Sequence, residues 1–133
     1  MQPEPDAPLC LCFELDADFF YLIRSYAERT GLRAETVQRG KDIVNQVRRQ
    51  QPAVLIFAID HPGREAAFAT LEELKANSNT QSLPAVVFSW IEDEESALER
   101  GADYFVRKPV MYADFLGALT TAGLRIGTKS IDA

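Results

Sequence analysis

The sequence predicts an α/β fold: one doubly wound, five-stranded parallel sheet with five helices on its two faces. Two observations carry this prediction. Short apolar runs alternate along the chain with segments whose apolar residues recur at helical spacing, which is typical of a parallel sheet covered on both sides. The length of 133 residues and the hydrophobic fraction of 47% suit one domain with an ordinary buried core.

The first strand and helix follow from the start of the chain. Residues 9–13, LCLCF, form a continuous apolar run between Pro8 and Glu14 and predict a strand buried on both faces. The next segment places apolar side chains on one face of a helix: Phe19, Leu22, Ile23, Tyr26 and Ala27. Asp16 can cap the start of this helix, and Gly31 can terminate it.

The next segments predict two strands around a short helix. Residues 33–37 are half polar, so we expect a short strand near the edge of the sheet. The second helix is marked by three apolar residues at helical spacing: Ile43, Val44 and Val47. It should stop before Pro52. Residues 53–59 carry β-branched and aromatic side chains and give the strongest strand signal, and Asp-His-Pro-Gly at 60–63 predicts a turn.

The second half repeats the alternation. A third helix is marked by four apolar residues: Ala67, Phe68, Leu71 and Leu74. Residues 77–82 are polar and loop-like, and residues 85–88 predict a fourth buried strand. Residues 92–100 predict a fourth helix, with acids in its first turn and Arg100 in its last, as the helix dipole favours. A fifth strand at 104–106 and a last helix follow, the helix marked by Phe115, Leu116 and Leu119.

The domain is expected to span residues 9–123. We expect residues 1–8 to be a disordered tail and residues 124–133 to be a C-terminal tail that frays beyond Gly123. No apolar run approaches the roughly 18 residues that cross a bilayer. The Pro-rich, acidic start lacks the basic and apolar regions of a signal peptide, so a cytoplasmic location is expected.

The charge distribution argues against nucleic-acid binding. The net charge is −6 and the pI is about 4.8. The closest approaches to a basic surface are the pairs Arg48-Arg49 and Arg107-Lys108, and two adjacent cations do not form a surface that follows a phosphate backbone.

The two cysteines, Cys10 and Cys12, should point to the same face of the first strand. Their α-carbons would then lie roughly 6.5–7 Å apart, at the limit of disulfide reach, with parallel side-chain vectors. Two small buried core residues are the common situation. A CxC metal or redox site is the alternative, and no second pair of ligands lies nearby in the sequence.

Polar residues follow the strands where functional sites occur in this fold class, at the carboxyl ends of the sheet. Glu14 follows the first predicted strand, Asp60 the third, Ser89 the fourth and Lys108 the fifth. No glycine-rich phosphate loop accompanies them.

Four stretches, in order, resemble the receiver domain of bacterial response regulators: FELDADFFYLIRSYAERTGL, QPAVLIFAIDHPG, LPAVVFSW and GADYFVRKPV. The resemblance covers residues 9–123 and implies a flavodoxin-like architecture with strand order 2-1-3-4-5. In that family, two acidic residues after strand one help to hold Mg²⁺, and an aspartate that ends strand three accepts a phosphoryl group. A Ser or Thr after strand four and a lysine after strand five contact the phosphate.

The resemblance implies that the phosphorylation pocket of this chain is degenerate. Glu14 matches the first acidic position, whereas Leu15 falls at the second. Ala58 falls at the phosphoacceptor position, and Ser89 and Lys108 match the two phosphate-contacting positions. Acyl-phosphate formation requires a carboxylate nucleophile, and an alanine methyl group cannot attack phosphorus.

Metal binding and catalysis are therefore not expected. Mg²⁺ requires near-octahedral oxygen ligation, and Glu14 is the only acid left at a matched position. We expect Mg²⁺ binding to be weak or absent, with Glu14 as a weak candidate ligand, and we expect no cofactor and no enzymatic activity. The resemblance further implies that Phe105 is the aromatic switch position and that the Lys108–Pro109 bond is cis.

Asp60 and Lys108 have two interpretations each. Asp60 lies two residues after Ala58 and could be a substitute phosphoacceptor or a partner for Lys108. The more common situation is a turn residue whose side chain accepts a local backbone hydrogen bond. Lys108 could pair with Glu14 or Asp60 and hold the pocket shut, or it could stay solvated, since a surface ion pair adds only about 0–1 kcal/mol.

Three further features of the sequence also have two interpretations each. Trp90 could cap the pocket or anchor a partner, and plain packing is the alternative. His61 and Glu65 could suggest a metal pair, but one such pair is too little for a structural zinc site, so a surface histidine is expected. The acidic run 92–95 could dock a basic partner, although a solvated helix start explains it.

We therefore expect a pseudo-receiver that acts by protein–protein interaction through its fourth helix, fifth strand and fifth helix. The partner would be a sensor kinase, another regulator or an output domain, and a homodimer is also plausible. Two alternatives remain open: an atypical receiver phosphorylated at a displaced carboxylate, Asp60 or Glu14, and a flavodoxin-like domain that binds a small ligand in the crevice.

Overall fold

The computed structural model describes residues 6–37, 42–60, 63–90 and 94–124. The strands are β1 (Leu9–Phe13), β2 (Arg33–Thr36), β3 (Val54–Ala58), β4 (Ala85–Ser89) and β5 (Tyr104–Arg107). The helices are α1 (Ala17–Arg29), α2 (Ile43–Gln50), α3 (Arg64–Ala76), α4 (Glu94–Glu99) and α5 (Tyr112–Thr121).

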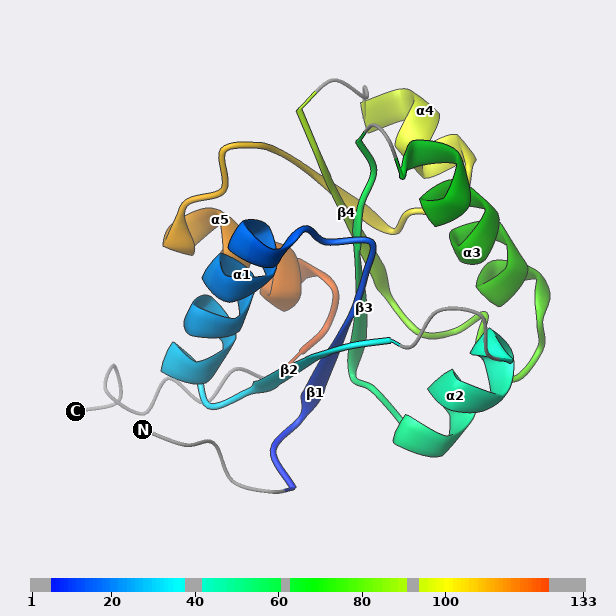
Figure 1. Ribbon diagram of the computed structural model, residues 1–133, viewed down its shortest axis with the longest axis horizontal. Helices are drawn as coiled ribbons and strands as arrows, with labels where there is room; N and C mark the ends of the chain where they lie inside the picture. Colours follow the sequence, from blue (N-terminus) through cyan, green and yellow to red (C-terminus); the bar gives the residue numbers. More distant parts are fainter. Residues whose placement is uncertain (1–5, 38–41, 61–62, 91–93, 125–133) are drawn as a thin grey trace.

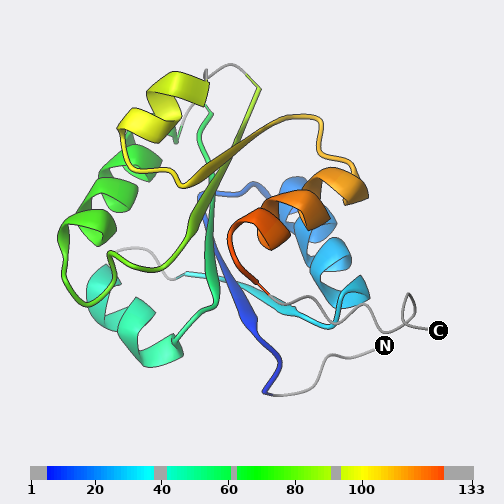
Figure 2. The same ribbon diagram turned by 180° about the vertical axis from the view of Figure 1, so that it is seen from behind.

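The strands form one parallel sheet in the order β2-β1-β3-β4-β5, which confirms the predicted fold class and strand order. Helices α1 and α5 cover one face of the sheet, and α2, α3 and α4 cover the other (Figure 1). The view from behind shows the same three layers, with α5 and α1 on one side of the sheet (Figure 2). The half-polar strand β2 lies at an edge, as its composition predicted.

Each face of the sheet has its own apolar core, because successive strand residues point to opposite sides. Leu11 and Phe13 pack on the α2–α3–α4 side, where the rings of Phe13 and Phe57 stack with centroids 4.4 Å apart. Cys10 and Cys12 pack on the α1–α5 side. Both cysteines are buried free thiols, so the core interpretation of the CxC pair is confirmed.

The predicted signals for the ends of α1 are confirmed. Asp16 is the N-cap, and its carboxylate accepts a hydrogen bond from the Phe19 backbone N–H at 2.8 Å. The helix ends at Arg29, and Gly31 follows with a φ of +82°, a left-handed conformation that glycine adopts without a steric penalty.

Several element boundaries differ from the predictions by one or two residues. The strand predicted at 53–59 spans Val54–Ala58, and the strand predicted at 33–37 ends at Thr36. Strand β4 extends to Ser89 and β5 to Arg107 because these two residues pair with each other. Local composition does not determine where a strand finds its last partner, so these ends required the assembled sheet.

The predicted helix at 92–100 is observed as α4, which ends at Glu99 and not at Arg100. Glu92 and Asp93 of the predicted acidic helix start lie outside the described residues, as do His61, residues 1–5 of the predicted N-terminal tail and residues 125–133 of the C-terminal tail. No helix among the described residues is long and apolar enough to span a bilayer.

Candidate functional site

The carboxyl ends of the five strands meet at one edge of the sheet and line a cleft of about 730 Å³. Its wall includes Glu14 and Leu15 after β1, Ala58 at the end of β3, and Lys108 after β5. The parallel sheet brings these residues together, since all its strands end on the same side. The structure thus gathers the predicted pocket residues at one site.

Asp60 connects two segments of this cleft through its carboxylate. Its Oδ1 accepts a hydrogen bond from the Trp90 backbone N–H at 3.0 Å and lies 2.7 Å from the Ser89 hydroxyl oxygen. The Ser89 oxygen also lies 2.8 Å from the Ile59 carbonyl, so its single proton has two acceptors within reach. Asp60 therefore links the loop after β3 to the end of β4.

The other oxygen of Asp60 pairs with Lys108. The Lys108 Nζ lies 2.9 Å from Asp60 Oδ2 and 4.1 Å from the centre of the Phe19 ring. Lys108 is only 8% exposed, so its charge is neutralised inside the protein and not by water. The predicted pairing of Lys108 with Asp60 is confirmed, and the interpretation of Lys108 as a solvated loop residue is wrong.

The electrostatic environment keeps Asp60 ionised. Burial of the Asp60 carboxyl acts to raise its pKa, but the contacts with Lys108, Ser89 and the Trp90 N–H outweigh burial. The net result is a pKa below the ordinary value of an aspartate. The side chain is thus a carboxylate at neutral pH, with both oxygens engaged.

The interpretation of Asp60 as a turn residue with a local hydrogen bond is wrong within the described residues. Its hydrogen-bond partners, Ser89 and Trp90, lie 29 and 30 positions along the chain. The turn signal in the sequence is correct, but side-chain orientation depends on the neighbouring strand. A local pattern contains no information about that strand.

Ala58 and Leu15 leave the cleft short of oxygen ligands. Ala58 is buried at the end of β3, and its methyl group stands where the resemblance expects the acceptor carboxylate. Glu14 is present, with a left-handed backbone φ of +63°, and a Cβ built on Gly63 would lie 3.1 Å from its Oε1. Within the described residues, no group of three or more His, Cys, Asp or Glu side chains could hold a metal ion.

Trp90 lies at the rim of the cleft and is 57% exposed. Its backbone is fixed on both sides: the N–H donates to Asp60, and the carbonyl accepts a hydrogen bond from the Arg107 guanidinium at 2.7 Å. Trp90 is thus not a core residue, and plain packing of its covered part stays a prediction. Capping of the cleft and anchoring of a partner both remain consistent with this position.

Two further predicted residues lie beside the site. The Lys108–Pro109 bond is cis, as predicted. Phe105 is half-buried, packs against the α2–α3–α4 core and has the Arg107 guanidinium 5.2 Å from its ring centre. Its predicted role as a switch stays a prediction.

Sequence reasoning missed Phe19 and Arg107 as parts of the site. Phe19 was assigned only to the buried face of a helix, yet its ring contacts the Lys108 ammonium. Arg107 was considered only as half of an adjacent basic pair, yet it holds the Trp90 carbonyl. Neither contact has a local sequence signal, since the partners lie 17 or more residues away.

Comparison with solved structures identifies the same fold in signalling proteins. A sensor protein from Polaromonas sp. JS666 is 23% identical, with a TM-score of 0.72 over 86% of this chain and 94% of its own. Chemotaxis protein CheY4 of Vibrio cholerae is 16% identical, with a TM-score of 0.73 over 87% of this chain and 98% of its own.

The receiver domain of a sensor histidine kinase from Pseudomonas aeruginosa PAO1 was solved with magnesium in its active-site cleft. It is 18% identical to this chain, with a TM-score of 0.72 over 89% of this chain and 99% of its own. No protein-family model matches the sequence, and no curated protein matches it either. At these identities the structural likeness establishes the fold, and the function has to be argued from the site.

Proposed function

We propose that the chain is a two-component signalling module of the receiver type that acts by binding a protein partner, without aspartyl phosphorylation. The observation that carries the proposal is the pair formed by Ala58 and Asp60. The residue at the acceptor position has no nucleophile, and the Asp60 carboxylate already contacts Lys108 and Ser89. On this proposal the chain is not an enzyme.

The Asp60–Lys108 pair acts as an internal substitute for the phosphoryl group. In the receiver domains that this chain resembles, the residues at the Ser89 and Lys108 positions contact phosphate oxygens. Here a carboxylate oxygen lies 2.7 Å from the Ser89 hydroxyl, and the other lies 2.9 Å from the Lys108 ammonium. The ends of β4 and β5 are thus held in one arrangement by a permanent negative charge.

The second candidate function is phosphorylation at Asp60, and the same contacts favour it. Asp60 lies beside the two side chains that would contact a phosphoryl group. Against it, Oδ1 has two donors within reach and Oδ2 faces an ammonium group, which withdraws electron density from the nucleophile and blocks its approach. Because both carboxylate oxygens of Asp60 already have partners, we favour partner binding without phosphorylation over phosphorylation at Asp60.

Intact-mass spectrometry after treatment with acetyl phosphate and Mg²⁺ distinguishes the two functions. We expect no added phosphoryl mass on the native chain or on the Asp60→Ala variant. A phosphoryl group that appears on the native chain and is lost in Asp60→Ala would overturn the proposal and establish the second candidate. The Asp18→Ala variant, which removes an exposed carboxylate on α1, is the matched control.

We place the partner-binding surface on α4, β5 and α5, next to Trp90. The exposed Trp90 and the Arg107 beside it are the residue types most enriched in binding hot spots. A photo-crosslinking residue at position 90 should capture a partner in the native host, whereas one at Tyr21, which is 65% exposed on α1, should not. Equal capture from both positions would contradict this placement.

A further inference from the structure

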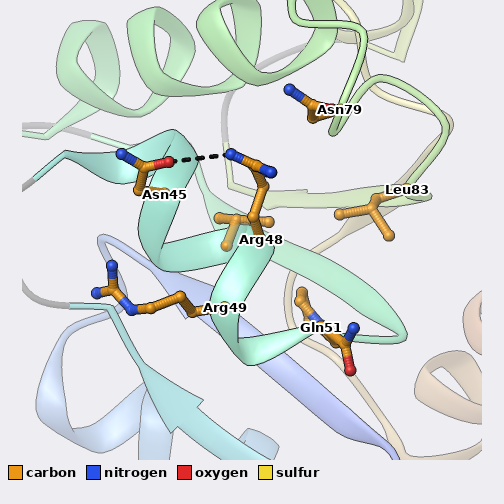
Figure 3. A pocket seen from close by; sticks show the side chains of 8 residues that line it. Asn45, Arg48, Arg49, Gln51, Asn79 and Leu83 are labelled. Atoms are coloured by element: carbon orange, nitrogen blue, oxygen red, sulfur yellow. Dashed lines mark hydrogen bonds between the residues drawn. The ribbon is translucent and has the colours of Figure 1, made fainter.

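A second cavity lies far from the cleft, beside the amino ends of β3 and β4. It has a volume of about 550 Å³ and is enclosed by α2, the turn into β3 and the loop between α3 and β4 (Figure 3). This volume is within the range of small-molecule sites, about 300–1,000 Å³. Nothing in the proposed signalling function uses this cavity.

The charge of the cavity wall is opposite to that of the whole protein. Arg48 and Arg49 line the cavity, and no acidic residue does, although the chain carries a net charge of −6. Within the described part of the chain, neither arginine forms an ion pair. In Figure 3 the Arg49 side chain points away from Arg48, so one guanidinium group without a counter-charge, that of Arg48, faces the hollow.

Arg48 is held in position by its neighbours on α2. Its Nη1 donates a hydrogen bond to Asn45 Oδ1 at 3.3 Å, and Asn45 Nδ2 donates to Asp42 Oδ2 at 2.7 Å. Figure 3 shows the Arg48 side chain on the side of α2 that faces Asn79 and Leu83. One N–H of the guanidinium fork is thus used to orient it, and the others remain available to a ligand.

The rest of the wall combines apolar surface with carboxamides. Leu83 is half-buried and supplies the apolar floor of the cavity, whereas Val47 and Pro52 are buried and offer little surface. The side chains of Gln51 and Asn79 are exposed at its rim and can donate further hydrogen bonds. An apolar floor with a few polar groups at its rim is typical of sites for small organic molecules.

We propose that this cavity binds a small organic oxyanion: a carboxylate or a phosphate carried on a compact apolar body. The guanidinium fork of Arg48 can bind two oxygens of either group, and Leu83 would contact the apolar part. The negative end of the α2 dipole lies at the same helix terminus and opposes an anion, so the site depends on the positive charge of Arg48.

The same dipole supplies the competing explanation. Cations in the last turn stabilise a helix without any ligand, and Arg48 and Arg49 occupy that turn. The two explanations differ in what they require of the cavity. Stabilisation of the helix needs only positive charge, whereas recognition of an oxyanion needs the guanidinium fork and the apolar floor together.

The test is a titration of the full chain with small probes. Binding is monitored by the chemical shifts of the backbone amides in two-dimensional NMR spectra. The probes are phenyl phosphate, benzoate, inorganic phosphate and the neutral analogue benzyl alcohol. We expect saturable shifts at residues 45–52 and 79–83 with phenyl phosphate or benzoate. Inorganic phosphate should bind more weakly because it lacks the apolar body, and benzyl alcohol should cause no shift there. The stronger of the two aromatic probes identifies the preferred oxyanion.

Variants of exposed arginines make the test specific. Arg48→Gln should weaken the binding about tenfold, and Arg48→Lys, which keeps the charge but loses the fork, should weaken it as well. Arg24→Gln removes an exposed arginine on α1 and should change nothing. Shifts that never saturate, shifts spread over the whole chain, or an affinity unchanged in Arg48→Gln would overturn the proposal and leave the arginines as helix-stabilising cations.

Discussion

At the scale of single residues, Asp60 is the side chain that links the ends of β3, β4 and β5 at the cleft. Its carboxylate contacts Lys108, Ser89 and the Trp90 backbone together. Lys108 is buried, so removal of the Asp60 charge would leave an ammonium group inside the protein without compensation. Removing one partner therefore destabilises the fold by more than the net stabilisation that the ion pair contributes, because the lysine still carries its desolvation penalty.

The Asp60→Asn variant should be less stable than the native chain by about 1–3 kcal/mol at pH 7. The measurement is urea unfolding, with Asp18→Asn on the exposed surface of α1 as the matched control. Lys108→Met should destabilise to a similar degree. In the double variant the two effects should not add, since each removes the same pair. Additive effects would show that Asp60 and Lys108 act independently.

The contribution of Asp60 to stability should depend on pH. Its pKa in the folded protein lies below the value of about 3.9 that applies in the unfolded chain. A lowered carboxyl pKa stabilises the fold above the unfolded value, and this stability is lost as the pH falls through the folded pKa. The stability difference between the native chain and Asp60→Asn should therefore be constant from pH 5 to pH 7 and shrink below about pH 4. A difference that grows in acid would contradict this sign.

At the scale of elements, Lys75 joins the end of α3 to the start of two strands. Its ammonium donates hydrogen bonds to the Leu83 carbonyl at 2.8 Å and the Gln81 carbonyl at 3.2 Å. It also pairs with Asp103 Oδ2 at 2.6 Å, and the same oxygen accepts the Ala85 N–H at 2.8 Å. The loop before β4 and the turn before β5 are thus fixed to one side chain.

Lys75→Met should lower the unfolding free energy by about 1–3 kcal/mol, because it leaves two carbonyls and a carboxylate without their shared donor. Urea unfolding measures the change. Arg24→Met removes a cation from the exposed face of α1 and should change the free energy by less than about 0.5 kcal/mol. Equal effects of the two variants would show that Lys75 is an ordinary surface lysine.

Helices α1 and α5 are joined through Tyr26. Its hydroxyl donates a hydrogen bond to the Val110 carbonyl at 2.9 Å, and its ring contacts those of Tyr112 and Phe115. Tyr26→Phe keeps the rings in contact and removes only the hydrogen bond, so we expect a loss of about 1 kcal/mol in thermal or urea unfolding. Tyr21→Phe, at an exposed position of the same helix, should be neutral. A neutral Tyr26→Phe would mean that water replaces the hydrogen bond.

At the scale of the whole molecule, the buried sheet places both thiols beyond the reach of solvent. Cys10 and Cys12 are 0% and 1% exposed in the central layer. Burial raises the pKa of the Cys10 thiol to about 12 and raises that of Cys12 well above its ordinary value. The thiols are therefore neither accessible nor ionised in the folded protein.

Alkylation of the two cysteines should follow global unfolding. In native buffer at pH 8, iodoacetamide should leave both thiols unmodified over hours, and in concentrated urea both should react at once. Mass spectrometry measures the extent of modification at increasing urea, and its midpoint should coincide with the unfolding midpoint. Modification far below that midpoint would show that β1 opens locally while the rest of the sheet stays folded.

The sequence by itself determined the architecture. Apolar periodicity is a local property, so the order of strands and helices, the buried pair Cys10 and Cys12, and the Asp16 cap could be predicted from neighbouring residues. The chemistry of Ala58 is local as well, because no arrangement of neighbours gives a methyl group a lone pair.

Only the tertiary structure decided what the remaining polar residues do. The local sequence predicts that Asp60 is a turn residue, yet its hydrogen-bond partners lie at the end of the neighbouring strand. The position of Trp90 depends on the hydrogen bonds that its backbone forms with Asp60 and Arg107. The pairing of strands brings together residues that are 17 to 30 positions apart in the chain. Contacts between residues so far apart in the chain depend on how the elements pack, and a local sequence pattern does not contain that information.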